Sequence, residues 1–184
     1  MQPFDTARLH CRPLIAADAA GMFALDSDPA VHRYLGGVGG LMVSSPEESA
    51  ATVAFIQAQY AANGIGRWAV LLRETGEFMG WAGLKLVAGP VNGHRDFYDL
   101  GYRFRPPFWG QGYGYEAAQA WLDHGFRTMQ LPLPRICAYA DAENRGSCRI
   151  LEKVGLRSGN EFEEGGTRCV WYEADNPQPA LSVS

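Results

Sequence analysis

Residues 105–116, RPPFWGQGYGYE, constrain the fold more than any other stretch of the chain. Before them, over residues 98–104, large side chains alternate with small or polar ones as in a β-strand, and two prolines then prevent that strand from continuing. From Tyr113 onward apolar residues recur at helical spacing. The sequence therefore predicts a strand, a glycine-rich turn and a helix, in that order.

The glycines at 110, 112 and 114 favour an anion site at this turn. Without a Cβ they allow several backbone amides to converge on a bulky anion. The unpaired amides of the first helical turn add the positive end of the helix dipole, so a pyrophosphate group is the natural ligand. Spaced glycines are also typical of a flexible turn or of a dinucleotide-binding unit, and these residues alone leave all three interpretations open.

The overall composition predicts one globular domain. A chain of 184 residues with 47% hydrophobic residues can bury one substantial core, and we expect a single domain over residues 1–175 followed by a loose tail over 176–184. The net charge is −4 and no Lys/Arg cluster is dense, so nucleic acid is not an expected partner, whereas an amine substrate is compatible with this charge. We see no secretory leader and no membrane-spanning run, and expect a cytoplasmic protein.

The cysteines are scattered and show no Cys-x-x-Cys spacing. We therefore expect neither a metal site nor a disulfide framework, and reduced thiols instead. The four positions are Cys11, Cys137, Cys148 and Cys169.

The remaining segments predict a mixed α/β domain of about seven strands, in which hairpins lie on both sides of the central strand–turn–helix–strand unit. Loops are expected at 36–40, rich in glycine, at 131–134, and at 89–96, a polar segment placed to overhang a site. Besides 98–104, strands are expected near 8–13, 67–73, 78–86, 135–140, 156–162 and 168–173, and helices near 15–25, 45–63 and 145–153, with a short helical turn after Asp28-Pro29.

Two blocks together strongly resemble the acyl-CoA-binding core of the GNAT N-acetyltransferases. They are WGQGYGYEA at residues 109–117 and NRGSCRILEKVGL at 144–156, in the family's order and at a matching separation. The opening TARLHCRP, residues 6–13, is similar to the branch that contains the N-terminal acetyltransferases of ribosomal proteins. The resemblance covers about residues 5–173 and implies the GNAT α+β fold: a mixed, mostly antiparallel central sheet flanked by helices. It argues against a doubly wound dinucleotide fold, because the glycines come late and hairpins flank them.

The resemblance implies acetyl-CoA as cosubstrate, with a pyrophosphate loop, a strand that pairs with the pantetheine arm, and an asparagine that reaches the same arm. Trp109 stands where the family often has Arg or Gln, a departure that the ribosomal branch shares. A helix N-cap role explains Asn144 equally well. The residues that match cofactor contacts are Gln111, Gly112, Tyr113, Gly114 and Tyr115 in the loop, Tyr102, Arg103 and Phe104 in the strand, and Asn144.

For catalysis the resemblance implies direct attack of the amine on the thioester, without a covalent enzyme intermediate. Asp99 lies where many relatives carry a carboxylate that takes the amine proton, although a solvated strand-edge acid explains it equally well. The family's usual tyrosine acid is missing, since its position holds Leu151. Ser147 matches a position proposed to protonate the thiolate in the ribosomal branch, and a serine that only satisfies backbone groups is the alternative.

Other reactive side chains are weaker candidates. Cys148 is near a helix N-terminus, but no histidine partner stands at a recognisable spacing, so a nucleophilic role is not favoured. His94 and Asp96 are further base candidates that loop polarity alone explains. The aromatic residues expected in the core rather than against a ligand are Phe55, Tyr60, Trp68, Trp81 and Trp171.

The sequence thus predicts an acetyl-CoA-dependent N-acetyltransferase that acts on a primary amine, either a protein N-terminus or a small molecule. A polyamine, amino-acid or aminoglycoside acetyltransferase is the alternative among enzymes. A non-catalytic acyl-CoA sensor is the alternative outside them, and the missing tyrosine mildly supports it. We expect residues 31–44 and 88–97 to read the acceptor, and the last hairpin to offer a surface for a homodimer.

Overall fold

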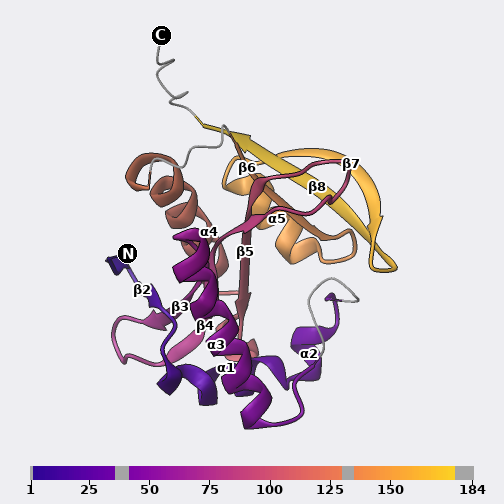
Figure 1. Cartoon of the computed structure of the whole chain (residues 1–184). Helices are drawn as coiled ribbons and strands as arrows, with labels where there is room; N and C mark the ends of the chain where they lie inside the picture. Colours follow the sequence, from indigo (N-terminus) through magenta and orange to yellow (C-terminus); the bar gives the residue numbers. More distant parts are fainter. Residues whose placement is uncertain (1, 36–41, 130–134, 177–184) are drawn as a thin grey trace.

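The described part of the chain, residues 2–35, 42–129 and 135–176 of a computed structural model, forms one eight-stranded sheet in the order β1-β2-β3-β4-β5-β6-β8-β7 (Figure 1). Neighbouring strands are antiparallel except β5 and β6, which are parallel. The expected mixed, mostly antiparallel sheet is confirmed. The strands are β1 (Phe4–Asp5), β2 (Leu9–Pro13), β3 (Arg67–Leu72), β4 (Phe78–Val87), β5 (Phe97–Phe104), β6 (Arg135–Asp141), β7 (Arg157–Glu164) and β8 (Thr167–Asp175).

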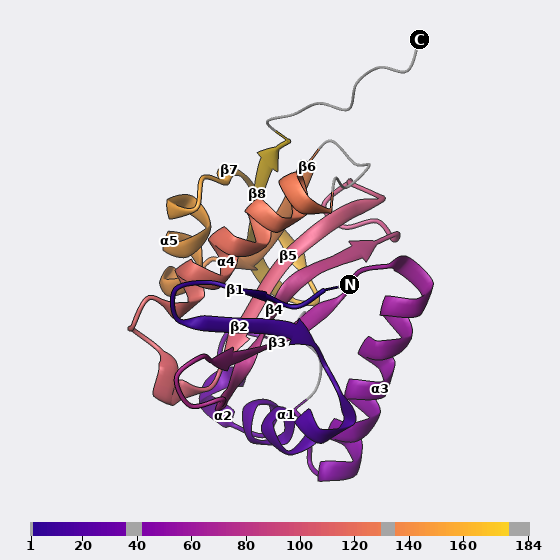
Figure 2. The same ribbon diagram turned by 90° about the vertical axis from the view of Figure 1, so that its left-hand side faces the viewer.

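Helices flank the sheet on both faces (Figure 2). Side chains alternate along β3: Trp68 packs edge-to-face on Trp121 of α4 with ring centroids 5.0 Å apart, whereas Ala69 packs in a second cluster with residues of α1 and α3. The sheet therefore separates the α4 side from the α1–α3 side. The helices are α1 (Ala19–Asp26), α2 (Pro29–His32), α3 (Pro46–Asn63), α4 (Tyr113–Asp123) and α5 (Arg145–Lys153), with short 3-10 turns η1 (Ala16–Asp18) and η2 (Pro106–Phe108) and a π-helical turn η3 (His124–Thr128).

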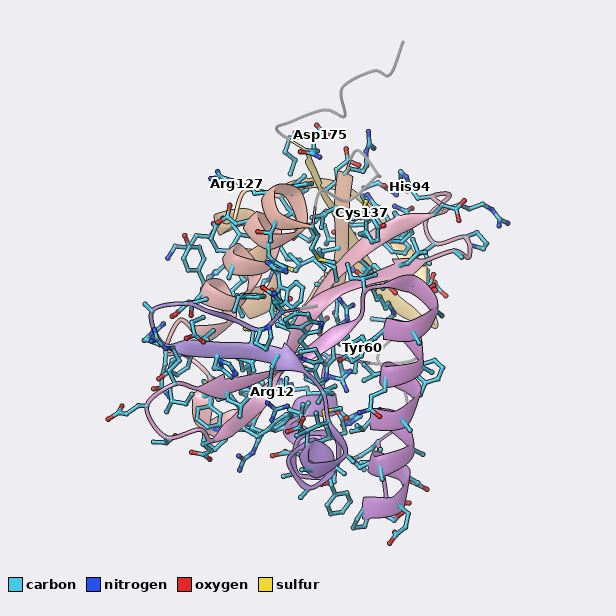
Figure 3. The ribbon with its side chains drawn as sticks, turned by 60° about the vertical axis from the view of Figure 1, so that its left-hand side comes forward. Arg12, Tyr60, His94, Arg127, Cys137 and Asp175 are labelled. Carbon is cyan, nitrogen blue, oxygen red and sulfur yellow. The ribbon has the colours of Figure 1, made fainter. Side chains whose placement is uncertain are left out.

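Local sequence signals set the ends of α3. The Ser45 side chain caps its N-terminus by accepting from the amide of Glu48, and Gly64, at a φ of +66°, ends it in the left-handed conformation. Tyr60 then joins this helix to the sheet, since its hydroxyl donates to the Arg67 carbonyl and accepts from the Leu14 amide at 3.1 Å. Figure 3 shows Tyr60 between α3 and the strands.

The two strands at the centre of the sheet separate part-way along their length. β6 pairs with β5 only at Tyr98 and Asp99, whereas β5 continues to Phe104 and pairs with β4 throughout. In the described structure no strand therefore lies beside the β6-facing edge of residues 100–104. A strand edge of this kind presents unpaired backbone groups to a ligand.

The structure differs from the expectations mainly at short elements. The additional strand β1 is two residues long, too short to leave a periodic pattern. The loop expected at 36–40, the turn at 131–134 and, apart from Asn176, the tail over 176–184 lie outside the described residues. All four cysteines are buried free thiols. No helix among the described residues is long and apolar enough to cross a bilayer.

Candidate active site

The glycine-rich turn leads directly into the N-terminus of α4. Gly110 and Gly112 have φ angles of +72° and +81°, a conformation that strongly favours glycine, and Gly112 is the N-cap of the helix. No side chain caps this end, so the first-turn amides stay available to an anion. Gly114 has a different role: a Cβ there would lie 3.0 Å from Cδ1 of Ile150, so this glycine allows α4 and α5 to approach each other.

The turn is held from outside by the N-terminal segment. The guanidinium of Arg8 donates to the Gln111 carbonyl at 2.9 Å, lies over the Tyr113 ring at 4.3 Å and forms an ion pair with Glu116 at 2.7 Å. Glu116 also accepts from the Arg8 amide and from the Thr6 hydroxyl. Burial raises the pKa of Glu116, but these hydrogen bonds outweigh that effect and lower it below the ordinary value of 4.5. The sequence did not predict this contact, although it joins two segments that resemble the family, residues 6–13 and 109–117.

The start of α5 carries Asn144 and Ser147, the two predicted site residues of that block. Asn144 is the N-cap, as one interpretation predicted, because its Oδ1 accepts from the Ser147 amide at 3.1 Å. Among the described residues Asn144 Nδ2 has no hydrogen-bond partner, so this side-chain amide nitrogen remains available to a ligand. The Ser147 hydroxyl lies 3.0 Å from the hydroxyl of Tyr102 on β5.

Tyr102 is the predicted strand residue that lies closest to this point. Its hydroxyl also donates to the Ser147 carbonyl at 3.2 Å. Burial raises the pKa of Tyr102 well above its usual range, against the opposing effect of the hydrogen bond to Ser147. The phenol is therefore a neutral hydrogen-bonding group at physiological pH.

A cavity of about 360 Å³ connects the start of α5 to the α1–α3 side of the sheet. Its lining includes Asn144, Ser147 and Tyr102 at one end and the charged face of β3, β4 and β5 at the other, with Asp99 among its residues. Helices α1 and α3, the segment after α2, and residues of β6 and β8 provide the remaining wall. Of the predicted site residues, Asp99, Tyr102, Arg103, Asn144 and Ser147 line this cavity, whereas Phe104 and the loop residues 111–115 do not.

Asp99 is buried in an ion pair with Arg67 of β3. Arg67 Nη2 lies 2.5 Å from Asp99 Oδ2, and the side chains are only 8–9% exposed. Burial lowers the pKa of Arg67, and the charge of Asp99 opposes that shift. Arg67 reaches its partner over two glycines paired in register, Gly83 and Gly101, and a Cβ on Gly101 would lie 2.6 Å from Arg67 Nη2. The alternative of a solvated strand-edge acid is therefore wrong, because Asp99 is buried and paired.

Two further cations line the same face of the cavity. Arg103 pairs with Asp26 of α1 at 2.6 Å and lies over the Trp81 ring at 5.2 Å, so its side chain points to the α1 side. Its backbone carbonyl faces β4, since a Cβ on Gly80 would clash with that oxygen. Lys85 stands opposite Asp99 in the strand register, with 3.9 Å between Nζ and Oδ2. Burial lowers the pKa of Lys85, which Asp99 opposes and Arg67 reinforces.

The strand edge expected to pair with the pantetheine arm already has one protein donor. The exposed Trp109 indole donates from Nε1 to the Phe104 carbonyl at 2.6 Å. This bond connects the turn to the end of β5, and it gives Trp109 a structural reason to stand at the first motif position. The backbone of Tyr102 remains on the edge of β5 that β6 does not cover.

Other candidates are placed away from the cavity. His94 stacks on Trp171 at 4.5 Å, near the tip of the β4–β5 hairpin (Figure 3), and no lining residue comes from 88–97. Cys148 is buried, with its thiol donating to the Asp141 carbonyl, and does not line the cavity. The segment 31–44 does contribute, through Tyr34 and Leu35. Phe55, expected in the core, is 65% exposed and lines the cavity instead, because α3 turns that position outward.

Comparison with known proteins identifies the family. Residues 8–157 match the model of an acetyltransferase (GNAT) domain. The chain belongs to the GNAT acetyltransferases. It is therefore an acyl-CoA-dependent acetyltransferase, and the fold and the family resemblance expected from its sequence are confirmed.

Several relatives of this GNAT protein match it over nearly their whole length. An uncharacterized N-acetyltransferase of Bacillus subtilis, YoaA, is 30% identical and the match covers 94% of this chain and 90% of YoaA. An acetyltransferase structure from Agrobacterium tumefaciens is 27% identical, with a TM-score of 0.75 and 95% and 94% coverage. RimL, a ribosomal alpha-N-protein acetyltransferase solved with coenzyme A, shares the fold at a TM-score of 0.74 and 15% identity, over 95% of this chain and 98% of RimL.

Proposed function

We propose that this GNAT enzyme transfers the acetyl group of acetyl-CoA to a primary amine, either a protein N-terminus or an amine of a small molecule. The observation that carries the proposal is the shared cavity, whose lining runs from Asn144 and Ser147 to the buried pair of Asp99 and Arg67. A cofactor end and a charged acceptor end in one cavity suit a reaction between two bound substrates.

For the cofactor, we assign the pyrophosphate to the amides of residues 111–115 and the pantetheine arm to the free edge of β5 at residues 102–104. Support comes from the uncapped N-terminus of α4, the separation of β6 from β5, and the available side-chain amide nitrogen of Asn144. Acetyl-CoA is the cosubstrate of the family, and the fold relative RimL was solved with coenzyme A.

For the chemistry, we assign Asp99 to accept a proton from the amine and Ser147 to protonate the leaving thiolate. Amine acetylation needs a neutral nitrogen, a polarised thioester carbonyl and a proton for sulfur. Asp99 lines the acceptor end of the cavity and Ser147 the cofactor end. Cys148, with its thiol turned to the Asp141 carbonyl, offers no route to an acyl-enzyme.

A thermal-shift titration with acetyl-CoA tests cofactor binding. A ligand that binds only the folded state at a concentration of 100 times its Kd stabilises it by about 2.7 kcal/mol. The melting temperature should therefore rise with acetyl-CoA and not with adenosine alone. No shift at saturating acetyl-CoA would contradict both the enzyme and the sensor interpretations.

Thiol release then separates an enzyme from a sensor. Acetyl-CoA is mixed with a panel of N-terminal peptides, polyamines, amino acids and aminoglycosides, and free thiol is measured. We expect release that depends on one class of amine, whereas a sensor binds acetyl-CoA without amine-dependent release.

We further propose a cytoplasmic location and a homodimer formed through β7, which stands at the edge of the sheet.

A further inference from the structure

The structure places a phenol beside Ser147 although the tyrosine usual in the family is missing at Leu151. We propose that Tyr102 is a positioning residue, whose hydroxyl holds the Ser147 hydroxyl toward the cavity and stabilises it while it gives its proton to sulfur. This inference rests on the proposed function, because it assumes that Ser147 protonates the thiolate. It adds a role for a side chain that the sequence had placed only among the cofactor contacts.

The contacts of Ser147 define this arrangement. Its amide donates to Asn144 Oδ1, its carbonyl accepts from the Tyr102 hydroxyl, and its own Oγ lies 3.0 Å from the same phenol oxygen. The Tyr102 hydroxyl is thus the only side-chain partner that the structure gives to Ser147 Oγ among the described residues. Both side chains line the cavity, so the serine hydroxyl is held at its wall.

The Tyr102 ring is itself fixed between the cofactor loop and α5. Its edge carbons would lie 3.9 Å from a Cβ on Gly114, and Ile150 of α5 packs against the same glycine. A phenol fixed in this way keeps its oxygen at one place on α5, so little conformational entropy is lost when it bonds to Ser147. The Tyr102 side chain thus lies against both the start of α4 and the helix that carries Ser147.

The proposed step balances without a charge on Tyr102. The nitrogen lone pair forms the new N–C bond, and the C–S bond breaks with its electron pair on sulfur. Sulfur takes the Ser147 proton, and the Tyr102 hydroxyl turns its one proton from the Ser147 carbonyl to the negative Oγ. Asp99 accepts the proton released by the amine, and solvent then restores the serine proton. Burial raises the pKa of Tyr102, which keeps the phenol protonated throughout this step.

The test compares steady-state kinetics of Tyr102→Phe, Ser147→Ala and the double variant. Loss of one hydrogen bond in the transition state should lower kcat of Tyr102→Phe about tenfold, with KM for acetyl-CoA unchanged. Ser147→Ala should lower kcat about a hundredfold, and the double variant should equal Ser147→Ala because Tyr102 acts only through the serine. The matched control is Tyr98→Phe, since Tyr98 lies on the same strand and face, outside the cavity.

The outcomes separate this inference from the proposed function. If Ser147→Ala lowers kcat and Tyr102→Phe does not, the positioning role is wrong and the acid role of Ser147 stands. If Ser147→Ala has no effect, both are wrong. If Tyr102→Phe lowers kcat further in the Ser147→Ala background, Tyr102 acts independently of the serine, which overturns the inference. Equal melting temperatures for Tyr102→Phe and Tyr98→Phe exclude a general loss of structure.

Discussion

At the scale of single residues, the buried pair of Arg67 and Asp99 determines how the site can be tested. Asp99→Ala leaves a buried guanidinium without its partner, and we expect unfolding to become easier by about 3–5 kcal/mol. Replacing both residues by apolar ones, Arg67→Met with Asp99→Leu, should restore most of that stability. Urea unfolding measures both effects, and an unchanged midpoint for Asp99→Ala would show that the pair contributes nothing. A loss of activity in Asp99→Ala therefore supports a role as general base only if the variant is still folded under the assay conditions.

A substitution at Gly101 perturbs the same ion pair without removing either charge. Because a Cβ there would lie 2.6 Å from Arg67 Nη2, Gly101→Ala must displace the guanidinium from the cavity floor. We expect KM for the amine to rise and stability to fall by about 1–3 kcal/mol, with acetyl-CoA binding retained. Gly89→Ala is the control, since a Cβ at Gly89 meets nothing within 4 Å. Equal kinetics for the two variants would remove Arg67 from the acceptor end of the site.

At the scale of elements, the N-terminal segment contacts the start of α4, beside the loop that we assign to the pyrophosphate. Arg8→Met removes the bond to the Gln111 carbonyl and the ion pair with Glu116. We expect KM for acetyl-CoA to rise about five- to tenfold, because the loop loses these contacts. The value of kcat should stay nearly unchanged, because Arg8 does not line the cavity that holds Asp99 and Ser147. Arg127→Met, which breaks an exposed ion pair further along the chain, should leave both constants as they are. A fall in kcat alone for Arg8→Met would contradict a loop-positioning role.

The same contact predicts how stability depends on pH. The pKa of Glu116 is lowered in the folded protein, so its contribution is fully present above the unfolded pKa of about 4.3 and is lost as pH falls through the lower, folded value. The difference in melting temperature between the native protein and Glu116→Gln should therefore be constant near neutral pH and shrink below pH 4.3 or so. A difference that stays the same at pH 3 would mean that the carboxylate charge is not what stabilises the contact.

The elements were predictable because their signals are local, whereas the contacts that complete the site were not. Ser45 and Gly64 mark the ends of α3, and the glycine turn, Asn144 and Ser147 could be recognised from two short blocks. The bonds from Arg67 to Asp99 and from Arg8 to Glu116 join residues 32 and 108 positions apart. Such partners depend on strand register and helix packing, which no local pattern encodes.

At the scale of the whole molecule, the candidate site lies where strand pairing in the sheet changes from antiparallel to parallel. The parallel pair β5–β6 is the point at which two strands separate, and α4 and α5 both begin beside it. The cavity continues from there to the opposite face, against α1 and α3. The residues that we assign to the cofactor and to the acceptor therefore come from opposite faces of one sheet and meet at this separation. Among the described strands, β1 and β7 form the two edges of the sheet.

The homodimer that we propose through β7 should be sensitive to salt. Glu161, Glu163 and Glu164 make this edge strand acidic against a single Arg157, and pairing of two β7 strands would bring like charges together. Salt screens that repulsion, so the dimer fraction should rise between about 0.05 M and 0.5 M NaCl. Glu163→Gln should raise it at low salt. Sedimentation velocity at several protein concentrations measures this, and a monomer under all conditions would exclude the β7 interface.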